Sequence, residues 1–331
     1  KVGFRMVSHW LVPVAVSGHS IITHRAKGKR MLQADRVKAL GTMSGTSLDG
    51  VDAAVIETDG VQIFGFGASD YRPYSAEEQA VLKAHLGRWP DDGVAAAAKI
   101  VEDVHLAVMK GFGGIELAGF HGQTLAHDPA GRGTHQCGNG ERLAQDLGYP
   151  VAWDFRTHDV AQGGQGAPLA PFYHFALAKW IKADAPLAFL NLGGVGNITW
   201  VDPAYDDPAD PDALLAFDTG PANAPMNDLM MQRQGVGYDK DGALAAKGKI
   251  DTTILDRFSD HPYFARPAPK SLDRDAFSDL ASDVSGLADA DALATLVQAV
   301  VQSVVQAVQH CRIAPSQLLV SGGGRHNKTV M

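Results

Sequence analysis

The sequence predicts an α/β protein built from two similar lobes, and three observations support that prediction. Two modules each begin with a strand, a glycine-rich turn and a second strand, at 37–57 and at 186–201. Polar clusters follow several buried apolar strands, and in open α/β sheets ligands bind beyond the carboxyl ends of the strands. The length of 331 residues fits two domains of about 150 residues each.

The composition is that of an ordinary globular protein, with 45% hydrophobic and 20% charged residues. A net charge of −8 gives no support to nucleic-acid binding, so we expect no nucleic-acid partner. Cys137 and Cys311 form neither a disulfide framework nor a metal-binding spacing. This use of cysteine favours a reducing compartment, and we expect a cytoplasmic location.

Residues 1–30 contain an apolar patch at 10–16 and a basic run at 24–30. A signal peptide would have a cleaner apolar stretch, and a membrane span would need about 20 apolar residues. We therefore expect no membrane partner and interpret 1–30 as an N-terminal extension outside the fold. The first lobe is then expected over 31–148 and the second lobe over 149–331.

The first lobe is expected to open with strands. After the apolar stretch 37–40 and its glycine-rich turn, strands are predicted at 51–57, 61–67 and 69–74. Ser75 precedes an acidic first turn and marks the start of a helical region over 76–110. Further along, 117–120 and 149–153 are predicted as strands, and 165–178 leads into a helix.

The second lobe repeats the pattern. Strands are predicted at 186–192, 198–201 and 214–217. From 293 to 308 apolar residues follow i, i+3, i+4, i+7 spacing, which predicts an amphipathic helix of about five turns. A buried strand at 317–320 then opens into a glycine-rich turn at 321–324.

The run Gly-Thr-Met-Ser-Gly-Thr-Ser-Leu-Asp-Gly-Val-Asp at 41–52 is the most informative segment. Its glycines let backbone N–H groups wrap an anion, and its hydroxyls add hydrogen-bond donors. No G-x-x-x-x-G-K-[ST] occurs, so a triphosphate would be held without a P-loop lysine. Asp49 is the candidate Mg²⁺ ligand, through water. The competing interpretation is a Gly/Ser-rich hairpin with no ligand. The nucleotide-binding candidates are Ser44, Gly45, Thr46, Ser47, Leu48, Asp49, Gly50, Val51 and Asp52.

Two glycine hairpins facing each other would hold ATP between two lobes. This order of elements resembles the actin-like, hexokinase-like ATPase fold, which is built on ribonuclease H-like lobes. The second hairpin supplies Gly193 and Gly194, and the late turn at Gly322, Gly323 and Gly324 suits an adenosine face. We therefore expect a two-lobed fold of this class with the active site in the interlobe cleft.

Seven sequence motifs make the resemblance specific to one family, and they occur in the same order as in that family over residues 37–331. Through them the chain resembles the anhydro-N-acetylmuramic acid kinases. The resemblance implies an enzyme of peptidoglycan recycling that uses ATP and Mg²⁺. Such enzymes open the 1,6-anhydro bridge of the sugar with water and phosphorylate O6, giving N-acetylmuramic acid 6-phosphate. The runs are GTMSGTSLDGVD (41–52), GFHGQTLAHDP (119–129), PVAWDFRTHDVAQGGQGAPLAP (150–171), NLGGVGNIT (191–199), AFDTGPAN (216–223), HPYFARPAPKSLDR (261–274) and SGGGRHN (321–327).

The chain departs from the family's pattern at two places. It ends seven residues after Gly324, whereas family members continue with a helical segment, so we expect effects on adenine closure and activity. Cys137 stands where the family often has an apolar residue, and this departure is expected to be neutral.

Asp218 is the candidate general base. It follows a buried strand and precedes Thr219-Gly220, so its carboxylate is expected to project into the cleft. An aspartate near its ordinary pKa of about 4 is ionised at neutral pH and can take a proton from water as it attacks the anomeric carbon. The competing interpretation is an aspartate that caps a helix beginning after Pro221.

The remaining candidates are expected around the sugar. The planar fork of Arg156 suits the lactyl carboxylate, although an interlobe salt bridge is the alternative. His121 could equally be a packed core histidine, and the two asparagines could satisfy turns. Lys270 is expected either to contact the substrate or to lie on a solvated loop. The substrate-binding candidates are His121, Gln123, Thr124, Asp154, Arg156, Asn197 and Asn223.

Two other functions stay open from the sequence. One is a different small-molecule kinase, or an acyl-phosphate-forming enzyme, on the same fold, which would differ at 121–124 and 154–168. The other is a non-enzymatic nucleotide-binding or assembly protein, which Asp218 and the dense polar lining disfavour. The oligomeric state is also open, with a homodimer as one option.

Overall fold

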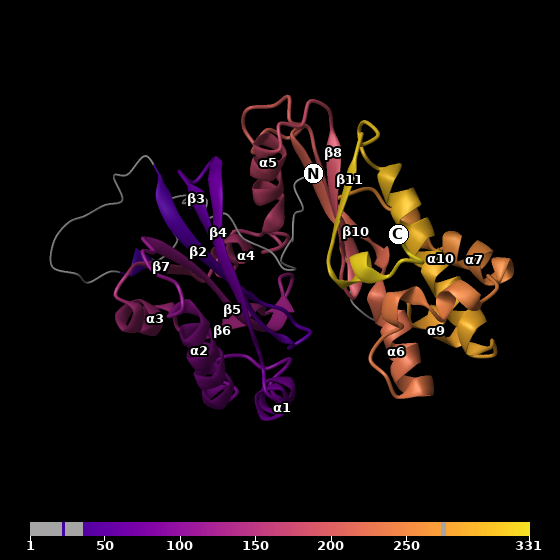
Figure 1. Cartoon of the computed structure of the whole chain (residues 1–331), viewed down its shortest axis with the longest axis horizontal. Helices are drawn as coiled ribbons and strands as arrows, with labels where there is room; N and C mark the ends of the chain where they lie inside the picture. The colour runs from indigo at the N-terminus through magenta and orange to yellow at the C-terminus, as the bar shows by residue number, and fades with distance from the viewer. Residues whose placement is uncertain (1–21, 24–35, 273–275) are drawn as a thin grey trace. The chain divides into compact units, whose positions relative to one another are not determined.

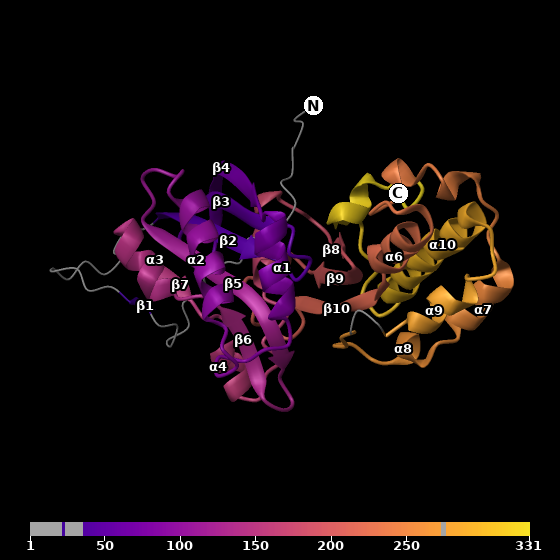
Figure 2. The same cartoon turned by 90° about the horizontal axis from the view of Figure 1, so that it is seen from below.

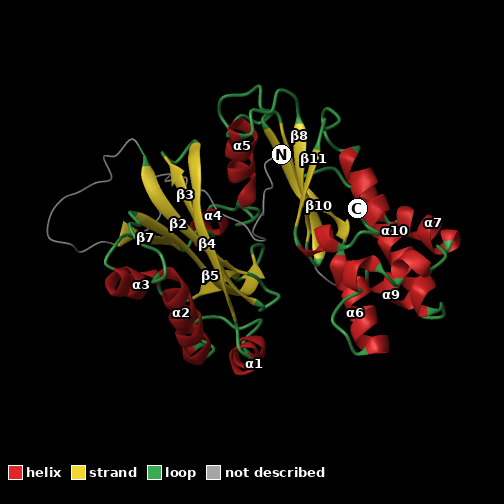
Figure 3. Ribbon diagram, viewed as in Figure 1, coloured by secondary structure: helices red, strands yellow, loops and turns green. Residues whose placement is uncertain are grey.

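The structure, a computed structural model, describes residues 22–23, 36–272 and 276–331. The chain forms two compact units, residues 1–180 and residues 181–331. Each unit combines a β-sheet with helices (Figures 1 and 3). Of the predicted extension 1–30, only 22–23 fall within the described residues. They form strand β1 (Ile22–Thr23), which pairs antiparallel with β7 (Val151–Trp153), so these two residues belong to the first sheet.

The first unit is built on a sheet of strand order β1-β7-β5-β2-β3-β4, with one further strand, β6, paired to β5. Strands β2, β3 and β4 form an antiparallel meander, while β5 and β7 run parallel to β2. The first glycine-rich segment forms the turn between β2 and β3, as predicted. The strands not yet defined are β2 (Val37–Ser44), β3 (Gly50–Thr58), β4 (Ile63–Pro73), β5 (Leu117–Asp128) and β6 (Gly133–Cys137).

The helices of the first unit begin and end at local signals. Helix α1 starts at a capping box in which Ser75 and Glu78 exchange hydrogen bonds. The predicted helical region 76–110 is divided, because 85–94 includes Pro90 and two glycines with positive φ, Gly87 and Gly93. The helices are α1 (Ala76–Ala84), α2 (Ala95–Met109), α3 (Gly140–Leu147), α4 (Thr157–Ala161) and α5 (Ala170–Trp180).

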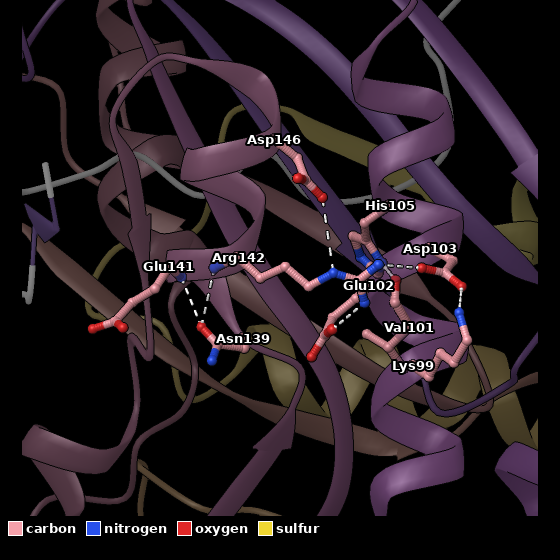
Figure 4. A network of polar contacts seen from close by, with 9 residues as sticks. All are labelled: Lys99, Val101, Glu102, Asp103, His105, Asn139, Glu141, Arg142 and Asp146. Carbon is pink, nitrogen blue, oxygen red and sulfur yellow. Dashed lines mark hydrogen bonds and ion pairs between the residues drawn. The ribbon is translucent and has the colours of Figure 1, made fainter. Parts of the chain in front are cut away.

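Helices α2 and α3 cover one face of this sheet (Figure 2) and are joined by an ion network (Figure 4). Arg142 of α3 donates to Glu102 and to Asp103 of α2, at 2.6 Å in both cases. Lys99 donates to Asp103 from one turn earlier on α2. Glu102 is buried, so the Arg142 guanidinium compensates a carboxylate that has lost most of its water.

The second unit repeats the strand order of the first. Its sheet has the order β10-β9-β8-β11, with β8, β9 and β10 antiparallel and β11 parallel to β8. The elements are β8 (Leu187–Leu192), β9 (Val195–Val201), β10 (Leu214–Pro221), β11 (Leu318–Ser321), α6 (Asn223–Gln234), α7 (Thr252–Ser259), α8 (Pro262–Ala265), α9 (Ser278–Asp283) and α10 (Asp289–Val308), with short 3₁₀ turns at Lys240–Gly242, Ala245–Lys247 and Gly323–His326.

Helix α10 is the core helix of the second unit. Its buried face includes Leu293, Leu296 and Val300, which pack against side chains of α6, α7 and the sheet. Among the described residues, α10 is the one helix long and apolar enough to cross a membrane by length and composition. A buried core helix can have the same length and apolar composition. Helix α10 carries the apolar face that the spacing at 293–308 predicts.

Both sheets place three antiparallel strands first and a parallel strand beside the first of them. This shared topology is that of the predicted two-lobed actin-like ATPase fold, which is confirmed. The boundary between the units differs from the predicted one at 148/149. Strand β7 pairs with β5 and helix α5 contacts β4, so 149–180 belongs to the first unit. Placement of the active site between the lobes stays a prediction.

Candidate functional site

The first glycine hairpin presents a short polar turn at the end of β2. Thr46, Ser47 and Asp49 are exposed there, whereas Leu48 is buried and turns back under the loop with φ of 57°. The Ser47 hydroxyl donates to Asp49 Oδ1 at 2.9 Å, and the N–H of Gly50 donates to the same oxygen at 3.1 Å. The tip is therefore an exposed group of hydroxyls and one carboxylate on a fixed backbone.

Gln123 of β5 ties this turn to the sheet. Its side chain is fully buried; Oε1 accepts from the Ser44 hydroxyl at 2.8 Å, and Nε2 donates to Gly45 O at 3.1 Å. Because the amide is engaged at both ends inside the protein, the structure gives Gln123 a positioning role in place of the predicted contact with substrate. Thr124, next in the strand, is half-buried and accepts from Gln136 Nε2 at 3.3 Å.

Strand β4 holds the turn from its other side. The Tyr71 hydroxyl and the Tyr74 N–H both donate to Asp49 O, at 2.8 and 3.0 Å. A Cβ at position 50 would lie 2.7 Å from the Tyr71 ring and 2.5 Å from Arg72 O, so only glycine fits. Burial raises the pKa of Tyr71, and the charges of Asp49 and Asp52 raise it further. Asp52 also pairs directly with Tyr71 across the two strands.

His121, within β5, and Arg156, three residues after β7, form a hydrogen-bonded pair in which His121 is buried and Arg156 is half-buried. The Arg156 Nε–H donates to His121 Nε2 at 3.0 Å, and His121 Nδ1 lies 2.8 Å from Gly122 O. His121 is therefore neutral, with its proton on Nδ1. Burial, followed by the charge of Arg156, lowers the pKa of His121 to about 3. His121 is 2% exposed, so its surroundings are those of a core histidine.

Arg156 is oriented by a second contact, from Nη1 to Gly166 O at 2.5 Å, and burial lowers its pKa to about 10. Its neighbour Asp154 adopts a left-handed backbone with φ of 56° and accepts from the Thr157 hydroxyl at 2.5 Å. The structure thus brings His121, Arg156 and the glycine loop at 163–166 together, whereas Asp154 is engaged with the start of α4.

The second glycine hairpin is locked to helix α6. Gly193 O accepts from the Asn223 N–H at 2.8 Å, and Gly194 O accepts from the Ala222 N–H at 3.0 Å. The Asn223 side chain donates to Leu192 O at 2.8 Å. Asn223 therefore satisfies the turn, the second of the two roles that the sequence left open.

The late glycine turn lies against the same hairpin. Gly322 has φ of +78°, and a Cβ there would come within 2.6 Å of Leu192 O and Asn191 Oδ1. Gly323 is exposed, and a Cβ on it would lie 3.6 Å from Asn223 Nδ2. The structure therefore brings the second hairpin, the start of α6 and the Gly322–Gly324 turn together within one unit, as the sequence predicts.

Asp218 lies on β10 just before a β-bulge and is half-buried. Its Oδ2 accepts from the Leu272 N–H at 2.8 Å. The helix that follows, α6, has Ala222 as its N-cap, so Asp218 does not cap that helix. Burial raises the pKa of Asp218 to about 6, partly opposed by the Leu272 hydrogen bond. The expected pKa of about 4 is therefore corrected upward, toward the value that suits a general base.

A row of polar residues crosses the second sheet at the level of Asp218. Asn197 pairs with Asp218 on one side and with Asn191 on the other, and Asn191 pairs with Ser321. Residues directly opposite one another share a face, so the four side chains project from the same side of the sheet. Sequence reasoning singled out Asn197 but missed Asn191 and Ser321, because their alignment depends on register between distant strands.

Lys270 lies in neither of the expected places. It is 7% exposed, and Nζ donates to Tyr263 O and Phe264 O, both at 3.1 Å. Burial, with the charge of Arg266, lowers its pKa. Lys270 is thus a buried internal tie, and its own carbonyl accepts from the Asp218 N–H at 3.0 Å.

Comparison with known proteins identifies the family. The sequence model of the anhydro-N-acetylmuramic acid kinases matches residues 37–331. An anhydro-N-acetylmuramic acid kinase of Cereibacter sphaeroides is 61% identical over 302 residues, which are 91% of this chain and 81% of that protein. The one of Ruegeria sp. is 54% identical over 304 residues, 92% of this chain and 81% of that protein.

Among solved structures, the activator of the 2-hydroxyisocaproyl-CoA dehydratase from Clostridium difficile with bound ADPNP matches 88% of this chain and 82% of its own, with 12% identity and a TM-score of 0.39. The sequence comparisons extend over both units, from the first glycine hairpin to the glycine turn after β11. The chain belongs to the anhydro-N-acetylmuramic acid kinase family.

Proposed function

We propose that this chain uses ATP to convert 1,6-anhydro-N-acetylmuramic acid into N-acetylmuramic acid 6-phosphate, with Asp218 as general base. The observation that carries the proposal is the half-buried Asp218 carboxylate, whose pKa is raised to about 6 by burial. It lies within β10, just before a β-bulge, in a row of polar residues and in the same unit as two glycine turns. Family membership supplies the reaction class.

The chemistry needs one base. Water attacks C1 of the sugar, the C1–O6 bond breaks, and the freed O6 accepts the γ-phosphoryl group of ATP. Asp218 takes the proton that the attacking water loses, which requires its ionised form. At pH 7 a carboxyl group with a pKa of about 6 is mostly ionised and is a stronger base than an ordinary aspartate.

The two glycine hairpins are proposed to hold the phosphates of ATP. Thr46 offers an exposed hydroxyl donor on the first turn, Ser47 is exposed there with its hydroxyl bonded to Asp49, and Gly194 and Gly323 are exposed in the second unit. Their backbones are fixed by Gln123 and by Asn223, so little order has to be gained on binding. The exposed face of the late glycine turn is proposed for the adenosine.

A magnesium ion is proposed to bind at the first turn only together with the nucleotide. Among the described residues no group of three or more His, Cys, Asp or Glu side chains could hold a metal alone. Mg²⁺ is usually bound by one or two carboxylates together with substrate phosphates and waters, and Asp49 can supply one. When bound, the ion would neutralise charge that develops on the phosphates.

Arg156 is proposed to receive the lactyl carboxylate of the sugar. Its guanidinium is held at Nε by His121 and at Nη1 by Gly166, which sets its orientation before substrate arrives. Asn197, opposite Asp218, is proposed to bond a sugar hydroxyl. The product places the enzyme in peptidoglycan recycling, which fits the expected cytoplasmic location.

Measured ADP release tests the proposal with a panel of sugars. We expect turnover with 1,6-anhydro-N-acetylmuramic acid, and at least about 10²-fold lower kcat/KM with free N-acetylmuramic acid and with 1,6-anhydroglucose. Free N-acetylmuramic acid lacks the C1–O6 bond that the reaction opens, and 1,6-anhydroglucose lacks the lactyl and N-acetyl groups that would supply binding energy. Equal turnover of a sugar with a free O6 hydroxyl would indicate another sugar kinase. ATP binding without turnover of any of them would indicate a nucleotide-binding protein.

A further inference from the structure

The segment from Tyr263 to Leu272 touches Asp218 at three separate points. The Tyr263 hydroxyl donates to Asp218 O at 2.5 Å. The Asp218 N–H donates to Lys270 O at 3.0 Å, and the Leu272 N–H donates to Asp218 Oδ2 at 2.8 Å. Both backbone groups of this residue and one oxygen of its carboxylate are therefore bonded to a single loop that lies outside the sheet.

The loop itself is held by the Lys270 ammonium. Nζ donates to the carbonyls of Tyr263 and Phe264, which draws the two ends of the loop together. Nζ also lies 3.1 Å from His310 Nε2, just beyond helix α10, and 4.7 Å from the centroid of the Tyr263 ring. A cation over an aromatic face is stabilised when water is excluded. Lys270 thus connects the loop, the tyrosine that touches Asp218 and the end of the core helix.

This arrangement differs from that of a substrate-binding lysine. The side chain is 7% exposed and its donors face main-chain carbonyls of its own unit. A buried ammonium is costly unless its hydrogen bonds are satisfied, so its presence here requires the loop to close around it. Removing the charge should release the loop and, with it, the three bonds to Asp218.

We propose that Lys270 is a positioning residue that fixes the loop 263–272 against Asp218 and so sets the place of its carboxylate. The proposal rests on the proposed function in one respect, since it takes Asp218 as the base. It adds that the geometry of this base depends on a lysine that never touches the substrate.

The consequence for pH dependence has a defined sign. A hydrogen bond from the Leu272 N–H favours the ionised carboxylate and lowers the pKa of Asp218, against the larger effect of burial. Loss of that bond would raise the pKa and move the acid limb of kcat/KM to higher pH. Within residues 36–272 and 276–331, the ionisable groups that act on this cluster include Tyr263, Arg266 and His310.

The experiment compares Lys270→Met, which keeps an unbranched side chain one atom shorter and without charge, with Lys270→Arg, which keeps the charge. Tyr263→Phe removes one bond to Asp218 with little change of shape. Tyr149→Phe is the matched control, because the Tyr149 hydroxyl is buried without a partner in the described part of the first unit. Each variant is assayed for kcat and kcat/KM against pH, for affinity toward a non-hydrolysable ATP analogue, and for melting temperature.

For Lys270→Met we expect kcat about 10²-fold lower, because a displacement of about 1 Å at a catalytic group has that effect. Its acid limb should lie at higher pH, while affinity for the ATP analogue stays within about threefold. Lys270→Arg should recover at least tenfold of the loss. Tyr263→Phe should lower kcat about five- to tenfold, as expected for one hydrogen bond. Tyr149→Phe should match the wild type.

A folded Lys270→Met enzyme with wild-type kcat and an unmoved acid limb would overturn the proposal. A lower melting temperature with an unchanged pH profile would also overturn it, since that is the signature of a merely structural lysine. If Lys270→Met does not fold, Tyr263→Phe decides: wild-type kcat and pH profile there exclude the positioning role of the loop. Asp218→Asn separates the two proposals. An active Asp218→Asn enzyme would exclude Asp218 as the base. An inactive Asp218→Asn enzyme together with unaffected loop variants would exclude only the positioning role of Lys270.

Discussion

The Nε–H of Arg156 donates a hydrogen bond of 3.0 Å to Nε2 of His121. A permanently charged guanidinium thus faces an imidazole that must stay neutral to accept the bond. His121 is 2% exposed, and its other nitrogen lies 2.8 Å from Gly122 O. The pair gives the first unit a fixed cation beside β5, just after the end of β7, and it makes protonation of His121 unfavourable in the folded state.

Acid should therefore destabilise the first unit before its carboxylates are protonated. Burial lowers the pKa of His105 to about 4, and burial with the Arg156 charge lowers that of His121 to about 3. Both folded values lie below the ordinary 6.5, so the unfolded chain takes up protons first, and stability present above pH 6.5 falls as the pH decreases. Each histidine should reduce the free energy of unfolding by about 2 kcal/mol between pH 7 and pH 5.

Urea unfolding at several pH values checks this expectation. His105→Leu should reduce the slope of stability against pH between 5 and 6 by about one proton. His326→Gln, a change at an exposed histidine, should leave the slope unaltered. A His105→Leu protein with the wild-type slope would mean that His105 is already protonated when folded.

Asp218→Asn should abolish turnover while leaving ATP binding nearly intact. Loss of a positioned general base lowers kcat by about 10²–10⁴-fold. In the wild type, kcat/KM should fall as the pH decreases through about 6, because protonation removes the base. Asn197→Ala serves as a comparison for loss of a neighbouring polar group. Retention of more than about a tenth of wild-type kcat by Asp218→Asn would exclude Asp218 as the base.

Gln123→Leu should weaken ATP binding although Gln123 is not expected to contact ATP. The change leaves the Ser44 hydroxyl and the Gly45 carbonyl without their buried partner, at about 1–3 kcal/mol for each such group. We expect a raised KM for ATP with little change in KM for the sugar. Gln136→Leu, on the neighbouring strand, is the matched control. Equal effects on both KM values would show general destabilisation and contradict a specific role at the turn.

Asp49→Ala should raise the Mg²⁺ concentration needed for half-maximal activity and should lower kcat more than it weakens sugar binding. The carboxylate lies on the exposed turn that is proposed to face the phosphates. Mg²⁺ titrations of kcat with wild type and variant measure the effect, with Asp59→Ala, at an exposed turn between β3 and β4, as control. An unchanged titration in Asp49→Ala would assign Asp49 a structural role.

Signals confined to a few neighbouring residues were sufficient to predict much of the fold. One short segment of sequence is enough to predict each of three features: the glycine turn after β2, the cap at Ser75 and the apolar stripe of α10. Strand β6 and helix α3 were missed, because β6 is only five residues long and α3 only eight. The unit boundary was misplaced because it depends on which sheet the three-residue β7 joins.

The site residues, like the elements of the fold, differ in how far a local sequence pattern predicts them. Residues that cluster by motif, such as Gly193 with Gly194, could be proposed from the sequence because they are neighbours in the chain. The internal partners of Gln123 and Lys270 could not be predicted, since a polar side chain that satisfies the protein's own carbonyls has the same sequence signature as one that faces a ligand. Asn191 and Ser321 reach the level of Asp218 only through strand register, which no local pattern specifies.

The fate of solvent oxygen separates hydrolytic ring opening with phosphorylation from every simpler reaction. Phosphorylation of O6 in a 1,6-anhydro sugar breaks its bond to C1, and C1 must then gain an oxygen from water. The reaction is run in ¹⁸O-water, and the products are weighed by mass spectrometry with fragmentation of the sugar. We predict one ¹⁸O at C1 of the phosphorylated sugar and none in its phosphoryl group. A phosphorylated sugar without label at C1 would contradict hydrolytic opening at a single base, and label confined to inorganic phosphate would show simple ATP hydrolysis.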